Sequence, residues 1–229
     1  MTNGGVSTGC HALDELLGDG LERGTVTQVY GPPAAGKTNV ALNAAVETAA
    51  SGGTAVYIDT EGLSVDRLEQ LLSGHTDGVQ AVSERIVVTE AHDFEEQAEA
   101  VQDVSEFAER ADLVVLDSAT GFYRLERTAE GDGGESLRAV ARQVTHLLSL
   151  ARRFDLAVLV TNQVYTDPDS DRTRGLGGHT LEHWTGTVVR LDRFRGGNRR
   201  ATLEKHRARP AGETARFRIG DSGLETVDG

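Results

Sequence analysis

The fold of this chain is decided by residues 25–38, Thr-Val-Thr-Gln-Val-Tyr-Gly-Pro-Pro-Ala-Ala-Gly-Lys-Thr. Gly31, Gly36, Lys37 and Thr38 occupy the fixed positions of the pattern G-x-x-x-x-G-K-S/T, which is typical of loops that bind phosphate. Strand-forming residues precede the pattern, and residues 39–50 repeat apolar side chains at helical spacing. The motif therefore lies between a strand and a helix. This context favours a nucleotide site over a glycine-rich turn that binds nothing.

The chemistry of such a loop is anion recognition. Backbone N–H groups of the loop and of the helix N-terminus point toward the β- and γ-phosphates of a nucleotide. Lys37 adds a positive charge, and the hydroxyl of Thr38 is a ligand for Mg²⁺. The candidate nucleotide-binding residues are Gly31, Pro32, Pro33, Ala34, Ala35, Gly36, Lys37, Thr38 and Asn39.

The composition is that of one soluble domain. At 229 residues the chain is long enough for an α/β domain with a substantial core, so we expect a single domain over residues 1–229. A single cysteine, Cys10, excludes an intramolecular disulfide and suits a reducing compartment. Residues 1–9 lack the pattern of a signal peptide, and the apolar runs 113–116 and 156–160 are too short to span a bilayer. We expect a cytoplasmic protein without a membrane partner.

The charge balance is acidic, and the basic residues are almost all arginines. The formal net charge is −13, and only Lys37 and Lys205 among the 23 basic residues are lysines. An acidic, lysine-poor surface resembles that of proteins from salt-loving archaea, where concentrated salt screens like charges. The alternative is an acidic protein encoded by GC-rich DNA, which also favours arginine.

One segment departs from this acidic balance. Residues 190–218 contain ten basic and three acidic residues, so their net charge is +7, while the remaining 200 residues carry −20. An acidic body with one basic region indicates a localised anionic partner.

The hydrophobic pattern predicts alternating strands and helices. Strands are expected at 54–59, 86–89, 113–116 and 156–161, and helices at 65–72, 94–108 and 137–151. A short helix within 6–22 is expected to be capped by Ser7 or Thr8. Loops are expected at 73–83, 118–135 and 162–183, where order returns near Thr180. Alternation around residues 196–198 predicts antiparallel hairpins. The predicted fold class is therefore α/β, a mostly parallel twisted sheet flanked by helices, with antiparallel C-terminal hairpins.

Three polar residues follow buried strands and complete the predicted site. Asp117 ends the apolar run 113–116 at the carboxyl edge of the sheet, where it either holds Mg²⁺ together with Thr38 or caps a turn. Glu61 lies beyond the strand 54–59 and is preferred over Asp59 as the base that orients and deprotonates a water. Gln163 either contacts the γ-phosphate through its amide or is simply a polar strand end.

Several segments around these residues resemble the RecA-type recombinases, a family of P-loop ATPases with a RecA-like core. They are Val6-Ser-Thr-Gly9, Tyr57-Ile-Asp-Thr-Glu-Gly62, Leu116-Asp-Ser-Ala-Thr120 with Tyr123-Arg124, and Val160-Thr-Asn-Gln-Val164. The short chain and the segment Leu176-Gly-Gly-His-Thr-Leu-Glu-His-Trp184 resemble the archaeal RadB branch of that family. The match covers nearly the whole chain, and the order and spacing of the motifs carry it.

The resemblance implies ATP and Mg²⁺ as cofactors and a role in homologous recombination and DNA repair. It implies two DNA-binding loops, at 118–135 and 164–182, the second of which follows a γ-phosphate sensor at Gln163. His183 matches a position that senses nucleotide across a subunit interface, and Pro210 matches the cap over a neighbour's adenine. The implied protein partners are a full-length archaeal recombinase, junction-processing proteins and a weakly bound second copy.

Departures from the family pattern indicate a limited activity. The recombinase core begins almost at Met1, so we expect the N-terminal DNA-binding domain and the aromatic polymerisation anchor to be missing. Ala208 stands where the adenine cap has an aspartate, and four carboxylates in 118–135 oppose Arg124 and Arg127. We therefore expect a weak ATPase that does not exchange DNA strands by itself.

The candidate DNA-binding residues are arginines of the two loops and of the C-terminal hairpin, namely Arg124, Arg127, Arg172, Arg174, Arg195, Arg199 and Arg200. Such a cluster neutralises the phosphates of single-stranded or branched DNA, with an affinity that falls as salt rises. The alternative is that these arginines pair with the abundant carboxylates, which contributes little stability. Trp184 can either stack on a base or pack at an interface.

The expected function is an ATP- and DNA-binding accessory protein of recombination with weak ATPase activity. One alternative is an ATP-dependent protein-binding switch of the RecA-like superfamily without a direct DNA role. The single Glu61 and the Thr-Asn-Gln segment at 161–163 argue against it. A second alternative is a small-molecule kinase, for which Arg172 and Arg174 would supply a lid, but nothing in the sequence specifies an acceptor.

Overall fold

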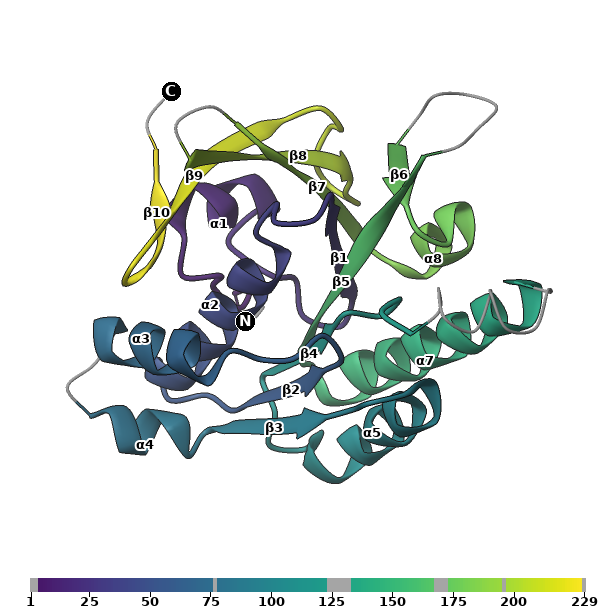
Figure 1. Ribbon diagram of the computed structural model, residues 1–229, viewed down its shortest axis with the longest axis horizontal. Coiled ribbons are helices and arrows are strands. Elements are labelled where there is room, and N and C mark those ends of the chain that lie inside the picture. Colours follow the sequence, from purple (N-terminus) through teal and green to yellow (C-terminus); the bar gives the residue numbers. More distant parts are fainter. Residues whose placement is uncertain (1–3, 76–77, 123–132, 167–172, 195–196, 228–229) are drawn as a thin grey trace.

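The computed structural model describes residues 4–75, 78–122, 133–166, 173–194 and 197–227. In these residues a mostly parallel sheet is covered by helices on both faces, and antiparallel strands extend it at its C-terminal end (Figure 1). The predicted fold class is confirmed.

The elements alternate along the chain as the hydrophobic pattern predicts. The helices are α1 His11–Leu17, α2 Lys37–Ala50, α3 Val65–His75, α4 Val79–Ser83, α5 Phe94–Phe107, α7 Gly133–Phe154 and α8 Gly178–Trp184. The strands are β1 Val26–Gly31, β2 Ala55–Asp59, β3 Ile86–Glu90, β4 Leu113–Asp117, β5 Ala157–Thr166, β6 Thr173–Gly175, β7 Thr187–Arg193, β8 Asn198–Lys205, β9 Thr214–Gly220 and β10 Gly223–Thr226. Their order in the sheet is β10-β9-β8-β7-β1-β5-β4-β2-β3, and β6 pairs with β5 outside this path.

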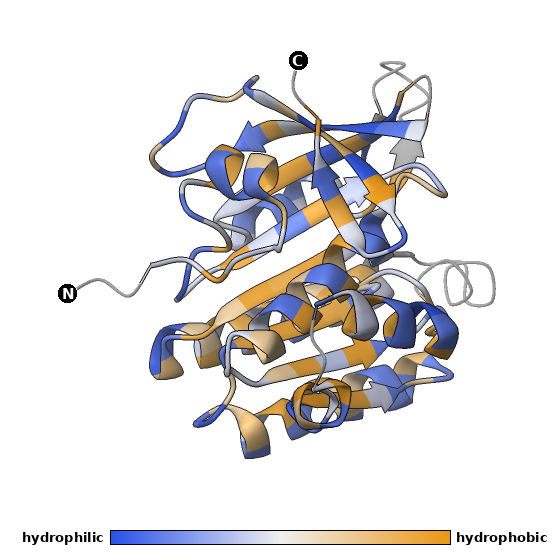
Figure 2. Ribbon diagram, turned by 90° about the vertical axis from the view of Figure 1, so that its left-hand side faces the viewer, coloured by the Kyte–Doolittle hydropathy of each residue, from blue (hydrophilic) through white to orange (hydrophobic). Residues whose placement is uncertain are grey.

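The parallel strands separate two hydrophobic cores. Strands β1, β2 and β4 are buried along their whole length. Because successive residues of a strand point to opposite faces, their apolar side chains are shared between the two sides of the sheet. Val29 and Tyr57 belong to the core with α1, α2 and α3, whereas Val56 and Ile58 pack with α5 and α7. Figure 2 shows these hydrophobic strands in the interior of the molecule.

The register of the parallel strands brings four chain segments to one edge of the sheet. Asp59 at the end of β2 lies opposite Asp117 at the end of β4. Gly31 at the end of β1 lies opposite Gln163 of β5. In α/β proteins, ligands bind at the carboxyl ends of such strands. The predicted phosphate-binding loop and the three predicted acidic and amide residues therefore meet at the same edge.

The antiparallel C-terminal strands pack against α1 and α2 rather than extending freely into solvent (Figure 1). Asn43 of α2 is 1% exposed and connects both ends of the chain to this helix. Its Nδ2 donates to the Thr8 carbonyl at 2.7 Å, and its Oδ1 accepts from the Leu224 amide at 3.3 Å. The helix that follows the phosphate-binding loop is thus held on two sides by segments that are distant in sequence.

Three local predictions were wrong. Neither Ser7 nor Thr8 caps α1, whose N-cap is Cys10; their hydroxyls instead donate to the Asp14 carboxylate at 2.6 and 2.7 Å. A short helix, α4, forms where a loop was expected, because Val82 packs into the core.

The third difference concerns the segment after Thr161. Strand β5 continues to Thr166, where a loop was expected, and β6 returns antiparallel beside it. Gly175 of β6 lies so close to the sheet that a Cβ there would be 2.6 Å from Gln28 Nε2. Pairing with β6 satisfies backbone N–H and C=O groups of β5 beyond Thr161. The sequence did not predict this extension, because the residues there are mostly polar and lack a strand-like apolar pattern.

None of the helices in the described residues is long and apolar enough to cross a membrane.

Candidate nucleotide-binding site

The glycine-rich loop joins β1 directly to α2. Gly31 has no room for a side chain, because a Cβ would lie 2.4 Å from the Leu191 carbonyl oxygen of β7. Gly36 has a φ of 104°, a left-handed conformation that L side chains rarely adopt, and it forms the N-cap of α2. Lys37 is the first residue of the helix. The two fixed glycines are therefore required by backbone geometry, which places the free N–H groups at the N-terminus of α2.

Lys37 is a buried cation at this helix end. Its side chain is folded onto the loop, and Nζ donates to the carbonyls of Gly31 at 3.0 Å and Pro32 at 3.2 Å. Burial lowers the pKa of its amino group, against the raising effect of Glu61 and Asp117. Both acceptors of the Lys37 hydrogen bonds are backbone carbonyls rather than carboxylates. Its charge is therefore available to an anionic ligand.

Asp117 is the buried carboxylate of the site. It is 1% exposed, and it accepts hydrogen bonds from the Tyr57 hydroxyl at 2.7 Å and from the Thr161 hydroxyl. Burial raises the pKa of its carboxyl, and hydrogen bonds from Thr161, Tyr57 and Thr38 oppose the rise. The hydroxyl of Thr38 and the carboxylate of Asp117 are therefore neighbours, as the predicted magnesium ligands must be.

Glu61 and Asp59 differ in what their carboxylates do. Asp59 is 3% exposed, and its two oxygens accept from the backbone amides of Glu61 and Leu63, so it organises the turn after β2. Glu61 is exposed and lines the cavity at the loop. This geometry supports the preference for Glu61 over Asp59 as the candidate base, because only Glu61 faces the space beside the loop.

The Glu61 carboxylate also connects two other strands. Its Oε1 accepts from the Ser118 hydroxyl at 2.8 Å and from Gln163 Nε2 at 3.1 Å. Ser118 follows β4 at the start of the predicted first loop, and Gln163 lies on β5, which leads to the predicted second loop. One carboxylate therefore joins the beginnings of both segments.

A second link between these segments lies deeper. The hydroxyl of Thr120 donates to Asn162 Oδ1 at 2.7 Å, and Asn162 Nδ2 donates to the Leu176 carbonyl at 2.8 Å. Thr120 and Asn162 are both fully buried. Asn162 thus links the segment after β4 to the backbone that follows β6.

The groups around the cavity at the loop suit the phosphates of a nucleotide with Mg²⁺. It has a volume of about 340 Å³ and is lined by Pro33, Ala34, Gly36, Lys37, Thr38, Asn39, Glu61 and Gln163. Among the described residues no group of three or more His, Cys, Asp or Glu side chains could hold a metal by itself. One hydroxyl and one buried carboxylate suit Mg²⁺, which usually takes its other ligands from phosphates and water. The residues present therefore fit the implied group.

Among the described residues, the arginines predicted to contact DNA do not form one patch. Arg124, Arg127, Arg172 and Arg195 lie outside the described residues. Arg199 and Arg200 are neighbours on β8, so their side chains point to opposite faces of the sheet.

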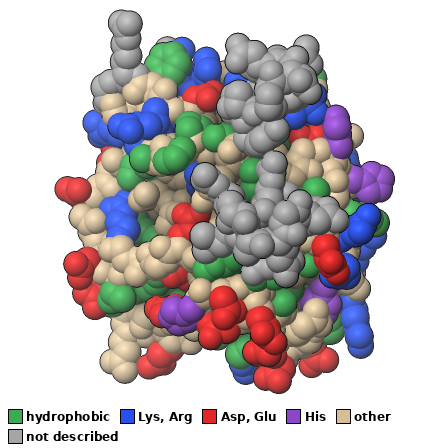
Figure 3. All heavy atoms as spheres, turned by 45° about the vertical axis from the view of Figure 1, so that its right-hand side comes forward, with side chains coloured by type: hydrophobic (Ala, Val, Ile, Leu, Met, Phe, Trp, Pro, Cys, Tyr) green, Lys and Arg blue, Asp and Glu red, His purple; other side chains and the backbone are tan. Residues whose placement is uncertain are grey.

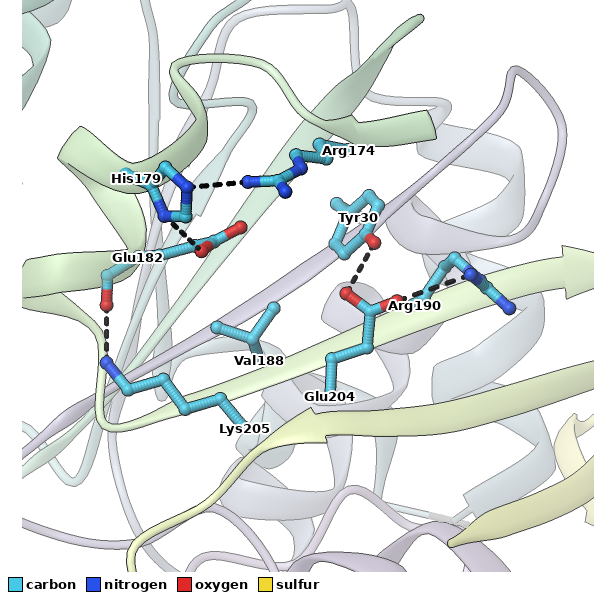
Figure 4. A pocket seen from close by; sticks show the side chains of 8 residues that line it. All are labelled: Tyr30, Arg174, His179, Glu182, Val188, Arg190, Glu204 and Lys205. Carbon is cyan, nitrogen blue, oxygen red and sulfur yellow. Dashed lines mark hydrogen bonds and ion pairs between the residues drawn. The ribbon is translucent and has the colours of Figure 1, made fainter. Parts of the chain in front are cut away.

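Arg174 lies in another part of the molecule, where it lines a second cavity, of about 500 Å³, between β6, α8 and the strands β1, β7 and β8 (Figure 4). In that cavity Arg174 Nη1 lies 2.7 Å from His179 Nε2. The hydroxyl of Tyr30, on the strand that leads into the phosphate-binding loop, donates to Glu204 at 2.5 Å, and Arg190 binds the same carboxylate. Arg174 is not among the residues lining the cavity at the loop, so the structure does not place it as a kinase lid.

The residues predicted to act across a subunit interface are exposed in the single chain. His183 lies in the last turn of α8 and makes an edge contact with Trp184, with their ring centroids 4.9 Å apart. Trp184 is 39% exposed, and Pro210 and Ala208 lie on the surface after β8. Their predicted roles require a second subunit and stay predictions.

Sequence reasoning missed the residues that form hydrogen bonds to the predicted site residues. Tyr57 and Thr161 bind Asp117, and Arg67 of α3 donates to Asn39 Oδ1 at 3.0 Å. Arg67 also donates to the carbonyls of Gly220 and Asp221 at 3.0 Å, so it links the first turn of α2 to the turn between β9 and β10. Alternation along β2 could have indicated the position of Tyr57, because residues two apart on a strand, such as Tyr57 and Asp59, point to the same face.

Comparison with known proteins decides the family. A family model described as Rad51 matches residues 4–227. The chain belongs to the Rad51 family. Within that family it is similar to the DNA repair and recombination protein RadB from Halobacterium salinarum, at 67% identity over 222 residues, covering 96% of this chain and 94% of the relative. RadB from Methanococcoides burtonii is 41% identical over 216 residues, covering 94% and 95% of the two chains.

A solved structure gives the same assignment for the fold. The crystal structure of the RadB recombinase matches with a TM-score of 0.83 at 35% identity and covers 97% of this chain and all of that one. The resemblance to RadB and the RecA-like recombinase fold are therefore confirmed for this member of the Rad51 family. Its acidic, lysine-poor composition is consistent with the similarity to relatives from a salt-loving archaeon.

Proposed function

We propose that this chain is an ATP- and Mg²⁺-binding accessory protein of homologous recombination and DNA repair that binds DNA and hydrolyses ATP slowly. Its relatives carry recombination and repair in their names, which supports the general role. The observation that carries the finer proposal is the Glu61 carboxylate at the nucleotide cavity, joined to Ser118 and Gln163. A group beside the phosphate site thereby connects to both segments predicted to contact DNA.

Each residue of the site has a distinct proposed role. ATP with Mg²⁺ supplies the anionic phosphates and the bond to be cleaved. The α2 N-terminus and Lys37 offer positive charge to the phosphates, and Thr38 and Asp117 offer oxygen ligands to the metal. Because Oε1 of Glu61 accepts both side-chain hydrogen bonds, Oε2 is the atom that takes a proton from an attacking water.

Slow turnover follows from the exposure of the candidate base. Glu61 is exposed in the single chain, so bulk water surrounds its carboxylate. Electrostatic stabilisation of a transition state is strong only where water is excluded. The site as it stands holds a nucleotide better than it hydrolyses one.

The DNA role is proposed for the basic side of the molecule. In Figure 3 acidic side chains are most frequent on the lower part of the face, while basic side chains appear both on its upper part and along its right-hand edge. Arg200 on β8 is half-exposed, with Nη2 3.2 Å from Asp192 and its guanidinium over the Phe194 ring. The partners we propose are single-stranded or branched DNA in the cytoplasm, a full-length archaeal recombinase and junction-processing proteins.

The nucleotide half of the proposal is tested with Lys37→Ala. Without the Lys37 charge, ATP affinity is expected to fall at least about 100-fold, because a buried charge-assisted contact is lost. Titration calorimetry with Mg²⁺ and ATP measures this, and Lys205→Ala, the only other lysine, is the control. Unchanged ATP affinity in Lys37→Ala would contradict the proposal.

The DNA half is tested by the salt dependence of binding. Binding of a fluorescent single strand is expected to weaken steeply with salt, with a smaller slope in a variant that carries Arg174→Ala and Arg200→Ala. If DNA does not bind at any salt concentration while ATP does, the protein-binding switch becomes the better account. Capture of a full-length recombinase in ATP against ADP then separates the two.

A further inference from the structure

The basic residues of the C-terminal hairpin lie on two different faces of the sheet. On β8, Arg199 lies opposite Arg193 of β7 and the fully buried Phe217 of β9. The next residue, Arg200, lies opposite Asp192 and the exposed Arg216. Arg199 therefore shares the inner face of the sheet, on the side of α1 and α2, whereas Arg200 belongs to the outer face.

The inner position brings Arg199 to the phosphate-binding loop. A Cβ built on Gly36 would lie 3.7 Å from Arg199 Nε and 2.8 Å from Ile219 Cδ1. The inner face of β8 and β9 thus rests directly on the turn that begins α2. Gly36 is the residue before Lys37, so the Arg199 side chain lies beside the loop, although outside the residues that line the cavity there.

Arg199 lacks the acidic partner that its neighbours have. Arg190, Arg200 and Arg218 all lie within 4 Å of a carboxylate. Arg199 Nη1 donates only to the carbonyls of Gly197 at 2.6 Å and Asn198 at 3.2 Å, and no carboxylate pairs with it in the described residues.

One donor of Arg199 is left without an acceptor. Its Nε is buried and has no hydrogen-bond partner among the described residues. Burial and the charge of Arg193 both lower the pKa of the Arg199 guanidinium. A buried donor without an acceptor is costly, and two facing cations repel each other, so this arrangement favours an anion nearby.

We propose that Arg199 is a second cationic ligand for the phosphate groups of the bound nucleotide, reaching the loop from the C-terminal sheet. The inference rests on the nucleotide binding proposed above. Lys37 and Arg199 then hold the phosphates from two different elements, and a guanidinium can form paired hydrogen bonds to phosphate oxygens. Because Arg199 stands on β8, nucleotide binding also fixes the position of the hairpin whose outer face carries Arg200.

The test compares Arg199→Ala with Arg216→Ala, a matched control. Arg216 carries the same charge one strand away, but it is exposed on the outer face. We expect Arg199→Ala to weaken ATP and ADP binding about 10- to 100-fold by calorimetry, and Arg216→Ala to leave both unchanged. Arg199→Lys is expected to restore part of the affinity, because it returns the charge without the planar fork.

A second measurement separates a binding defect from misfolding. Without nucleotide, Arg199→Ala is expected to melt at or above the wild-type temperature, because it removes the repulsion with Arg193 and the unpaired donor. Saturating ATP is expected to raise its melting temperature less than that of the wild type.

Lys37→Ala serves as the reference for the site itself. If Arg199→Ala binds ATP like the wild type while Lys37→Ala does not, the inference is wrong and the proposed nucleotide function stands. Loss of DNA binding in Arg199→Ala with unchanged ATP affinity would also overturn it and return Arg199 to the DNA-binding group. If Lys37→Ala itself retains ATP affinity, the proposed function and this inference both fail.

Discussion

At the scale of single residues, the carboxylates of the site differ by burial rather than by type. Asp117 is enclosed and held by hydroxyl groups, which suits an ion ligand that must stay in place. Both carboxylate oxygens of Asp59 accept hydrogen bonds from backbone amides, and Glu61 is exposed beside the cavity. The same functional group therefore suits a proposed metal ligand, a turn organiser and a candidate base, according to what surrounds it.

The role of Glu61 gives a prediction on turnover. Glu61→Gln keeps an oxygen that can accept from Ser118 and Gln163 but cannot take a proton. ATP hydrolysis is expected to fall about 100- to 10,000-fold, with ATP affinity within about threefold of the wild type. Phosphate release and calorimetry on the same sample check this. Glu69→Gln, an exposed residue of α3, is the control, and hydrolysis at the wild-type rate in Glu61→Gln would exclude Glu61 as the base.

The hydroxyl of Tyr57 gives a prediction on stability. It is buried and donates to the buried Asp117, so Tyr57→Phe leaves a carboxylate oxygen without this donor. The free energy of unfolding is expected to fall by about 1.5–3 kcal/mol. Urea unfolding measures it, and Tyr30→Phe, whose hydroxyl binds the half-exposed Glu204, is expected to lose less. Equal losses in the two variants would show that burial of the acceptor does not matter.

At the scale of elements, α2 is the point on which both ends of the chain converge. Asn43 binds Thr8 and Leu224, and Arg67 of α3 connects Asn39 to the turn between β9 and β10. The helix that carries the loop lysine is thereby held by the N-terminal segment, α3 and the C-terminal strands. These contacts matter for the proposed function, because the N–H groups proposed to bind phosphate lie at the first turn of this helix.

The contacts of Asn43 give a prediction on stability at the scale of elements. Asn43→Ala is expected to lower the free energy of unfolding by about 2–4 kcal/mol, since two buried backbone groups, the Thr8 carbonyl and the Leu224 amide, lose their partner. Chemical denaturation checks this, with Glu47→Ala, one turn further along α2 and half-exposed, expected to change stability by less than about 0.5 kcal/mol. A loss in Asn43→Ala no larger than that of the control would refute the proposed role of this side chain.

At the scale of the whole molecule, charge is the dominant feature. A net charge of −13 sets up self-repulsion, while the only strongly basic segment, 190–218, is proposed to face DNA and nucleotide. Salt has opposite effects on these two properties. It screens the acidic body and stabilises it, and it weakens phosphate contacts on the basic side.

The stability of the molecule is therefore expected to rise with salt. Between about 0.1 M and about 1 M KCl, where the Debye length falls from about 10 Å to about 3 Å, the melting temperature is expected to increase by at least about 5 °C. Differential scanning calorimetry with sodium chloride as a parallel series checks this. A melting temperature that falls with salt would contradict an origin of the acidic surface in adaptation to salt.

Sequence alone determined the chemistry of the loop and the order of the elements. The loop motif is defined by the properties of its own residues, Gly31, Gly36, Lys37 and Thr38. The periods of strands and helices are also local, so both features can be predicted from the sequence. Asp117 and Glu61 could be predicted as candidates because the ends of parallel strands meet at one edge.

Only the tertiary structure decided which residues share a face or a partner. Arg199 and Arg200 are adjacent in sequence, yet the strand register turns one toward Gly36 and the other outward. The Asn43 contacts and the β5–β6 pairing also join residues that are distant in the chain or lack an apolar pattern. These features depend on long-range packing and backbone pairing, whose energy is set by the partner and not by the local sequence.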